Sequence, residues 1–182
     1  MKKYQKMLLG LVVVASIATG CKKNKEELNE EELITTVQLK FTETGTTNVS
    51  TFTFRDIDGD GGNAPTAFDN IVLAPGKTYD MAIELKDESK TPAVDITDEV
   101  KEEGDEHQFY FVVSAANVTI SNLNNDANGL PLGTTARWVT GDASTGTVKV
   151  VLKHKPGGIK AAGDPITKGE TDIELNFNIR VQ

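Results

Sequence analysis

The chain has 182 residues, 38% of them hydrophobic, and a formal net charge of −8 at pH 7. A chain this acidic offers no basic face for nucleic acid or anionic lipid, so we expect neither as a partner. Cys21 is the single cysteine, which excludes an internal disulfide. The length is nevertheless enough for one domain to bury an adequate core.

The first 21 residues are organised like a secretory signal. Lys2, Lys3 and Lys6 precede an apolar run over residues 7–18, and small residues then lead into Cys21. The apolar run is too short to span a bilayer as a helix. The pattern therefore predicts that this segment directs export and is then removed.

The run Ala18-Thr19-Gly20-Cys21 resembles the lipobox of bacterial lipoproteins, although that box usually has leucine where this chain has Ala18. The resemblance implies that the Cys21 sulfur is acylated and that residues 1–20 are cleaved as the signal peptide. Two or three acyl chains would hold the protein at a membrane, because each buried methylene contributes ~0.8 kcal/mol. The alternative is a buried, unmodified Cys21 thiol after an ordinary secretory signal.

Residues 21–32 combine that cysteine with charged residues and almost no apolar content, which predicts a flexible tether. Lysines followed by acids at this place resemble the export signal of surface-exposed lipoproteins of the Bacteroidota. We expect an outer-membrane lipoprotein of the cell envelope, facing either the periplasm or the cell surface. Without residues 1–20 the chain keeps 16 basic residues against 27 acidic ones, a net charge of −11.

Beyond Leu33 the apolar residues recur with a period of two. The clearest example is residues 172–181, where odd-numbered apolar positions alternate with even-numbered polar ones. The pattern repeats near 37–42 and 79–86, and further strands are expected near 49–55, 69–74, 107–114, 117–123, 135–140 and 146–154. No segment has a long helical stripe, so residues 33–182 are predicted to form one all-β, antiparallel β-sandwich. Ala116-Asn117 is expected to make a tight hairpin between two strands.

Residues 73–79, with the sequence Leu-Ala-Pro-Gly-Lys-Thr-Tyr, resemble a corner of fibronectin type III and related immunoglobulin-like domains. In those domains a Pro-Gly pair precedes a strand that starts with tyrosine, and the tyrosine hydroxyl bonds to backbone a few residues upstream. The resemblance implies that Tyr79 clamps a crossover between the sheets of a Greek-key sandwich.

Residues 56–61, with the sequence Asp-Ile-Asp-Gly-Asp-Gly, match the first half of a calcium-binding loop. Counted from Asp56, the twelfth position is Ala67 in place of the bidentate glutamate, so an EF-hand is excluded. Two interpretations stay open. The segment is either an ordinary Asp/Gly turn or a Ca²⁺ site in a sandwich loop, with Asp56, Asp58 and Asp60 as ligands.

The two histidines have the parity of the apolar residues in their strands. His107 begins the expected strand 107–114 and His154 ends the expected strand 146–154. If these strands run antiparallel, both imidazoles lie at the same rim, with Asp105 on the same face. Two imidazoles with a carboxylate suit Zn²⁺ or Cu²⁺, and paired histidines can ligate haem iron. Alternatively, the histidines only cap strand edges and the acids form a solvated loop.

The remaining residues give little support for catalysis. Tyr110 and Trp138 could form a platform that stacks against sugars, or Trp138 could belong to the core. The sequence has no Gly-x-Ser-x-Gly elbow, no zinc-protease motif, no phosphate-binding glycine loop and no second cysteine. We therefore expect a protein that is not an enzyme.

Together with the lipobox, residues 56–62, 102–109 and 169–174 resemble small lipoproteins of the Bacteroidota. Some sandwich lipoproteins of these bacteria hand haem or glycans to outer-membrane receptors. Our first hypothesis is a non-enzymatic module that binds a ligand or partner, accessory to an outer-membrane receptor or transporter. The second is a metal- or haem-capturing lipoprotein that uses His107 and His154. The third is a structural or adhesin-like domain that binds another surface protein.

Overall fold

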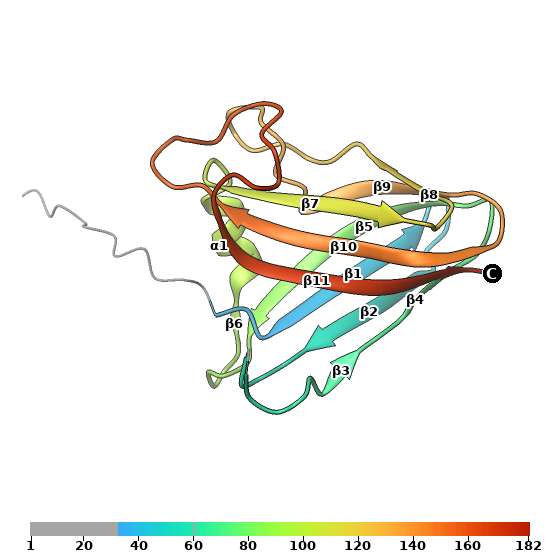
Figure 1. The fold of residues 1–182 in the computed structure, drawn as a ribbon, viewed down its shortest axis with the longest axis horizontal. Coiled ribbons are helices and arrows are strands. Elements are labelled where there is room, and N and C mark those ends of the chain that lie inside the picture. Colours follow the sequence, from blue (N-terminus) through green and yellow to red (C-terminus); the bar gives the residue numbers. More distant parts are fainter. Residues whose placement is uncertain (1–32, 60) are drawn as a thin grey trace, which may run out of the picture. The chain divides into compact units, whose positions relative to one another are not determined.

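Alternating apolar and polar residues form the longest strand of the protein, β11 (Glu170–Val181), as the period of two predicts (Figure 1). The structure is a computed structural model that describes residues 33–59 and 61–182. In β11 Phe177 and Ile179 are buried, whereas Asn176 and Asn178, which alternate with them, are exposed. The signal peptide, Cys21, the tether and Asp60 lie outside the described residues.

The larger sheet has seven described strands, and each pair of neighbours among them runs antiparallel. Its order is β3-β2-β1-β5-β9-β8, and β6 pairs with β5 outside this path. These strands are β1 (Thr36–Glu43), β2 (Val49–Arg55), β3 (Ala67–Phe68), β5 (Thr78–Asp87), β6 (Val94–Asp95), β8 (Val118–Ser121) and β9 (Thr135–Thr140).

The smaller sheet has four strands in the order β4-β11-β10-β7. Three of them are β4 (Ile71–Leu73), β7 (His107–Ser114) and β10 (Ser144–His154). The strand β4 runs parallel to β11 and pairs with it only from Ile179 to Val181. The edge of β11 from Thr171 to Leu175 therefore has no described strand beside it on the β4 side.

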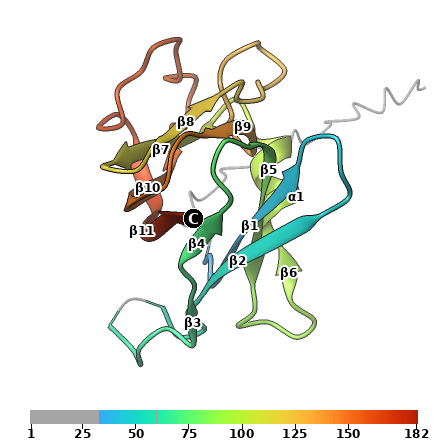
Figure 2. The same cartoon turned by 90° about the vertical axis from the view of Figure 1, so that its right-hand side faces the viewer.

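The two sheets pack face to face and bury the core between them (Figures 1 and 2). Trp138 of β9 is fully buried and meets Phe41 of β1 and Phe111 of β7, with ring centroids 4.9 and 5.9 Å away. The rings meet edge to face, a favourable arrangement for aromatic pairs. The predicted all-β sandwich is confirmed, and Trp138 belongs to its core. The Greek-key order of the strands stays a prediction.

Tyr79 clamps the crossover from β4 in the small sheet to β5 in the large one. Its hydroxyl accepts a hydrogen bond of 3.0 Å from the backbone N–H of Ala74, five residues upstream. The Tyr79 ring is buried and packs edge to face on Phe41. This is the backbone contact that the resemblance of residues 73–79 to a fibronectin corner implies.

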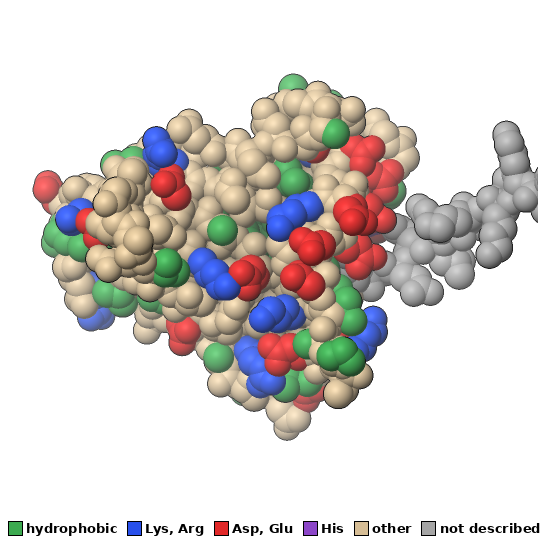
Figure 3. All heavy atoms as spheres, turned by 180° about the vertical axis from the view of Figure 1, so that it is seen from behind, with side chains coloured by type: hydrophobic (Ala, Val, Ile, Leu, Met, Phe, Trp, Pro, Cys, Tyr) green, Lys and Arg blue, Asp and Glu red, His purple; other side chains and the backbone are tan. Residues whose placement is uncertain are grey.

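The outer face of the large sheet is charged. Salt bridges join neighbouring strands there, including Arg137 to Asp80 at 3.1 Å and Lys40 to Glu84. Figure 3 shows basic and acidic side chains interspersed on the molecule seen from behind. Polar residues at the outward positions of these strands thus give the sandwich a hydrated surface, as the alternating pattern requires.

A helix, α1 (Ile96–Glu102), forms where the sequence has no long helical stripe, in the acidic segment before His107. The Asp95 side chain caps it by accepting a 2.8 Å bond from the Thr97 N–H. Ile96 and Val100, four residues apart, bury one side of the helix. Two apolar residues at this spacing are too short a stripe to distinguish a helix from an acidic loop.

The expected hairpin at Ala116-Asn117 is wrong. The strand β7 belongs to the small sheet and β8 to the large one, so residues 115–117 cross between the sheets. Ala115 takes a positive φ of 63° in this crossing. Gly146 of β10 lies against it so closely that a Cβ there would be 2.1 Å from the Ser114 carbonyl oxygen. The crossing thus depends on a glycine 30 residues away, which a local turn pattern does not reveal.

Candidate functional site

A cleft of about 400 Å³ opens where the end of β2 faces the start of β11. It lies at the edge of β11 that has no described strand beside it on the β4 side. Its apolar walls are Leu33, Ile34, Phe54, Ile173 and Leu175. Acidic side chains, Asp56, Asp172 and Glu174, also line it.

Asp56 is a buried acid of this lining. It is only 8% exposed, and its backbone N–H donates a 2.8 Å hydrogen bond to the Thr35 carbonyl. Its Oδ1 is buried and has no hydrogen-bond partner among the described residues. Burial raises the pKa of Asp56, and the adjacent Asp58 carboxylate raises it further. A buried carboxylate oxygen without a donor is costly unless something else supplies a positive charge.

Asp58 has the opposite environment. Its Oδ2 accepts bonds from the Asn63 backbone N–H at 2.9 Å and from the Asn63 side-chain amide at 2.7 Å. These donors hold the pKa of Asp58 below its ordinary value. The predicted calcium loop therefore brings Asp56 and Asp58 together, but its third carboxylate, Asp60, lies outside the described residues. Within residues 33–59 and 61–182, no group of three or more His, Cys, Asp and Glu side chains could hold a metal ion.

The two histidines meet at one rim, as their strand positions predicted. His107 and His154 pair directly across β7 and β10, and their rings stack with centroids 4.6 Å apart and planes 6° apart. His107 is 1% exposed, and its Nδ1 lies 3.1 Å from the Glu103 carbonyl oxygen. The nearest acids are Asp172, 3.9 Å from His107 Nε2, and Glu106, 3.6 Å from His154 Nε2. Burial lowers the pKa of His107, so its neutral form is favoured.

Stacked rings of this kind do not form the predicted zinc, copper or haem site. An imidazole nitrogen binds a metal along a direction in its own ring plane, and two parallel planes separated by a ring stack do not converge on one ion. Haem ligation requires imidazoles on opposite sides of the iron, which the stack also prevents. Asp105, the expected third ligand, is exposed and belongs to no metal-binding group of the described part.

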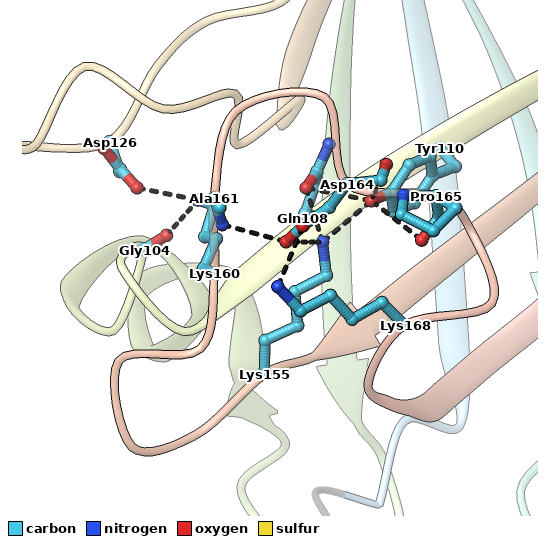
Figure 4. Close-up of polar contacts among 10 residues, drawn as sticks. All are labelled: Gly104, Gln108, Tyr110, Asp126, Lys155, Lys160, Ala161, Asp164, Pro165 and Lys168. Atoms are coloured by element: carbon cyan, nitrogen blue, oxygen red, sulfur yellow. Dashed lines mark hydrogen bonds and ion pairs between the residues drawn. The ribbon is translucent and has the colours of Figure 1, made fainter.

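The sequence did not reveal a buried polar network beneath residues 155–169 (Figure 4). Lys155 is fully buried, and its Nζ donates to Gln108 Oε1 and Tyr110 Oη, both at 2.7 Å. Asp164 Oδ2 lies 3.3 Å from the same Nζ. Burial lowers the pKa of Lys155, whereas bonds from Lys168 and Lys155 lower the pKa of Asp164 to about 2. The Tyr110 hydroxyl is thus engaged by Lys155 and by the Asp164 carbonyl, to which it donates a 2.9 Å bond.

A second buried pair ties the same segment to the rest of the sandwich. Lys160 Nζ donates to Asp126 Oδ2 at 2.7 Å and to the Gly104 carbonyl at 2.6 Å. Both charged side chains are 1% exposed. Asp126 Oδ1 accepts bonds from the backbone N–H groups of Asn128 and Leu130. Lys155 and Lys160 are buried and each is paired with an acid within the protein, so we assign them a structural role.

A scan against protein-family models gave no match, and searches of curated proteins and of solved structures gave none either. Among the described residues, no helix is long and apolar enough to cross a membrane. The functional conclusion therefore depends on the chain's own residues and their geometry.

Proposed function

We propose that this chain is a lipid-anchored, non-enzymatic binding module of the bacterial cell envelope, whose ligand occupies the cleft beside Asp56. The observation that carries the proposal is the buried Asp56 Oδ1, which lacks a donor among the described residues and lines an opening of about 400 Å³. A buried acceptor of this kind is stabilised when a ligand supplies the missing positive partner.

The anchor in this proposal is Cys21, through the lipobox that residues 18–21 resemble. The acidic body and the charged tether fit a domain held near an outer membrane but not bound to anionic headgroups. A non-enzymatic role fits the absence of catalytic motifs from the sequence. In this role the module captures its ligand and passes it to an outer-membrane receptor or transporter.

Metabolic labelling with a clickable fatty acid tests the anchor. We expect the wild-type chain to incorporate the label and Cys21→Ser to lose it, since this variant removes only the acylated sulfur. Protease treatment of intact cells then distinguishes the two orientations: release of the body indicates the cell surface, and protection until lysis indicates the periplasm. An unlabelled wild-type chain, or label that persists in Cys21→Ser, would contradict the proposal.

Co-purification from native membranes tests the partner. A transporter or receptor recovered with the wild-type chain supports ligand delivery. Recovery of the body in a free, unattached fraction, with no membrane partner after mild cross-linking, would contradict a role in uptake.

A further inference from the structure

We propose that the cleft binds an organic cation, an ammonium or guanidinium group attached to an apolar body, with Asp56 as the partner of the positive charge. This inference rests on the proposed function, because it names the ligand class of the same cleft. It follows from three observations: the charge of the lining, its apolar walls and the open edge of β11.

The part of the lining that the structure describes has negative charge and no positive charge of its own. Asp56, Asp172 and Glu174 line the cleft, and none of its described lining residues is lysine or arginine. Glu174 contacts Lys149 on the outer face of the small sheet, and Asp172 lies 3.9 Å from His107. Asp56 brings to this lining a buried Oδ1 that has no hydrogen-bond partner among the described residues. A charge-assisted hydrogen bond to that oxygen is stronger than one between neutral groups.

The apolar walls favour an organic ligand over a bare metal ion. Leu33, Ile34, Phe54, Ile173 and Leu175 supply methyl groups and one aromatic ring. Calcium requires six to eight oxygen ligands, and the carboxylates of the described lining are not gathered into a metal-binding group. An apolar body, in contrast, gains about 25 cal/mol for each Å² that it buries against such walls.

The uncovered edge of β11 offers further acceptors. Only Ile179 to Val181 pair with β4, so the strand has no described neighbour on that side between Thr171 and Leu175. An edge strand directs part of its backbone carbonyls away from its paired neighbour. An ammonium or guanidinium group has several N–H donors, so it can bond to Asp56 and to this backbone edge together.

Calorimetric titration of the full chain in detergent tests the inference with two probes that share one apolar body. Phenethylammonium carries the positive charge, and phenylacetate carries a negative charge on a similar body. We expect phenethylammonium to bind and phenylacetate to give no saturable heat. Asp56→Asn should weaken phenethylammonium binding by about tenfold or more, because a hydrogen bond to a charged group is lost.

Asp80→Asn is the matched control. It removes the same charge from an exposed residue whose partner, Arg137, lies on the outer face of the large sheet. We expect it to bind phenethylammonium as the wild type does. Leu33→Ala is the second cleft variant, and because Leu33 is 49% exposed, the fold should tolerate the change. This variant should bind about two- to fivefold more weakly, since part of one apolar wall is lost.

The inference would be overturned if both probes bound equally or if phenethylammonium did not bind. It would also be overturned if folded Asp56→Asn bound phenethylammonium with unchanged affinity. If Asp56→Asn does not fold, unchanged affinity in Leu33→Ala overturns it instead. A third outcome would assign the cleft to a metal and so overturn the inference. In that case Ca²⁺ alone would bind saturably, would displace phenethylammonium and would no longer bind in Asp56→Asn. Fatty-acid labelling at Cys21 is independent of these titrations, so a failed anchor and a failed ligand class are distinguishable.

Discussion

Removal of Lys160 should destabilise the protein far more than removal of a surface lysine. In Lys160→Met the Asp126 carboxylate stays buried, with its two backbone donors but without its countercharge, and the Gly104 carbonyl loses its donor. Breaking a buried ion pair by removing one partner costs about 3–5 kcal/mol, because the remaining charge is not compensated. Domains of this size are stable by only about 5–15 kcal/mol in total.

The expected loss corresponds to a fall in melting temperature of roughly 6–20 °C, since 1 kcal/mol moves the midpoint by about 2–4 °C in chains of 150–250 residues. Lys40→Met is the matched control. Its partner in the native protein is Glu84, and the two side chains are 35% and 37% exposed. Loss of such a surface pair should cost less than about 1 kcal/mol.

Urea unfolding followed by tryptophan fluorescence measures these losses, because Trp138 is the single tryptophan and is fully buried. A double-mutant cycle adds Asp126→Asn, which keeps the acceptor for the backbone donors and removes the charge. The double variant should cost about 1–3 kcal/mol less than the sum of the two single variants, because the two side chains interact directly. If Lys160→Met costs no more than Lys40→Met, or if the two single effects simply add, the buried pair does not hold the 155–169 segment as we argue.

Three further changes test other parts of the structure. Burial lowers the pKa of His107 below its ordinary value of 6.5, so the folded protein takes up a proton at this residue less readily than the unfolded chain does. The stability that neutral His107 contributes is therefore present above pH 6.5 and is lost as the pH falls below 6.5. The urea midpoint of the wild type should fall on acidification, and the midpoint of His107→Gln should fall less. Tyr79→Phe removes the bond to the Ala74 N–H and should cost about 1–2 kcal/mol by urea unfolding, whereas no loss would mean that the corner does not depend on the hydroxyl. Gly146→Ala places a Cβ 2.1 Å from the Ser114 carbonyl oxygen and should lower the melting temperature by several degrees, and an unchanged midpoint would refute the close approach.

The strands could be predicted from the sequence, because burial of one face of a strand makes apolar and polar residues alternate with a period of two. In β11 the alternation of Ile173, Leu175 and Phe177 with polar residues predicts both the strand and the side that it buries. The shared rim of His107 and His154 followed from the same parity. What parity could not give was the pairing partner of each strand, so the direct stack of the two rings became visible only in the structure.

The candidate cleft was only partly predictable. The Asp/Gly segment identified Asp56, but the walls come from Leu33 and from β11, more than 100 residues further along the chain. The buried lysines were hidden for the same reason. Lys155 directly follows β10 and continues the alternation at a position that would face outward. It is buried because residues 156–169 fold back over it and bring Asp164 to the Lys155 ammonium group. A lysine that is covered by a distant loop has the same local sequence pattern as one in solvent.

The position of Leu33 links one wall of the cleft to the first strand of the large sheet. Leu33 is a wall of the cleft and lies just before β1, which is hydrogen-bonded to β2 on one side and to β5 on the other. Tension that enters from the N-terminal side therefore reaches the cleft before it reaches the sheets. A pull on Leu33 would thus move one apolar wall of the cleft before it strained the hydrogen bonds of β1.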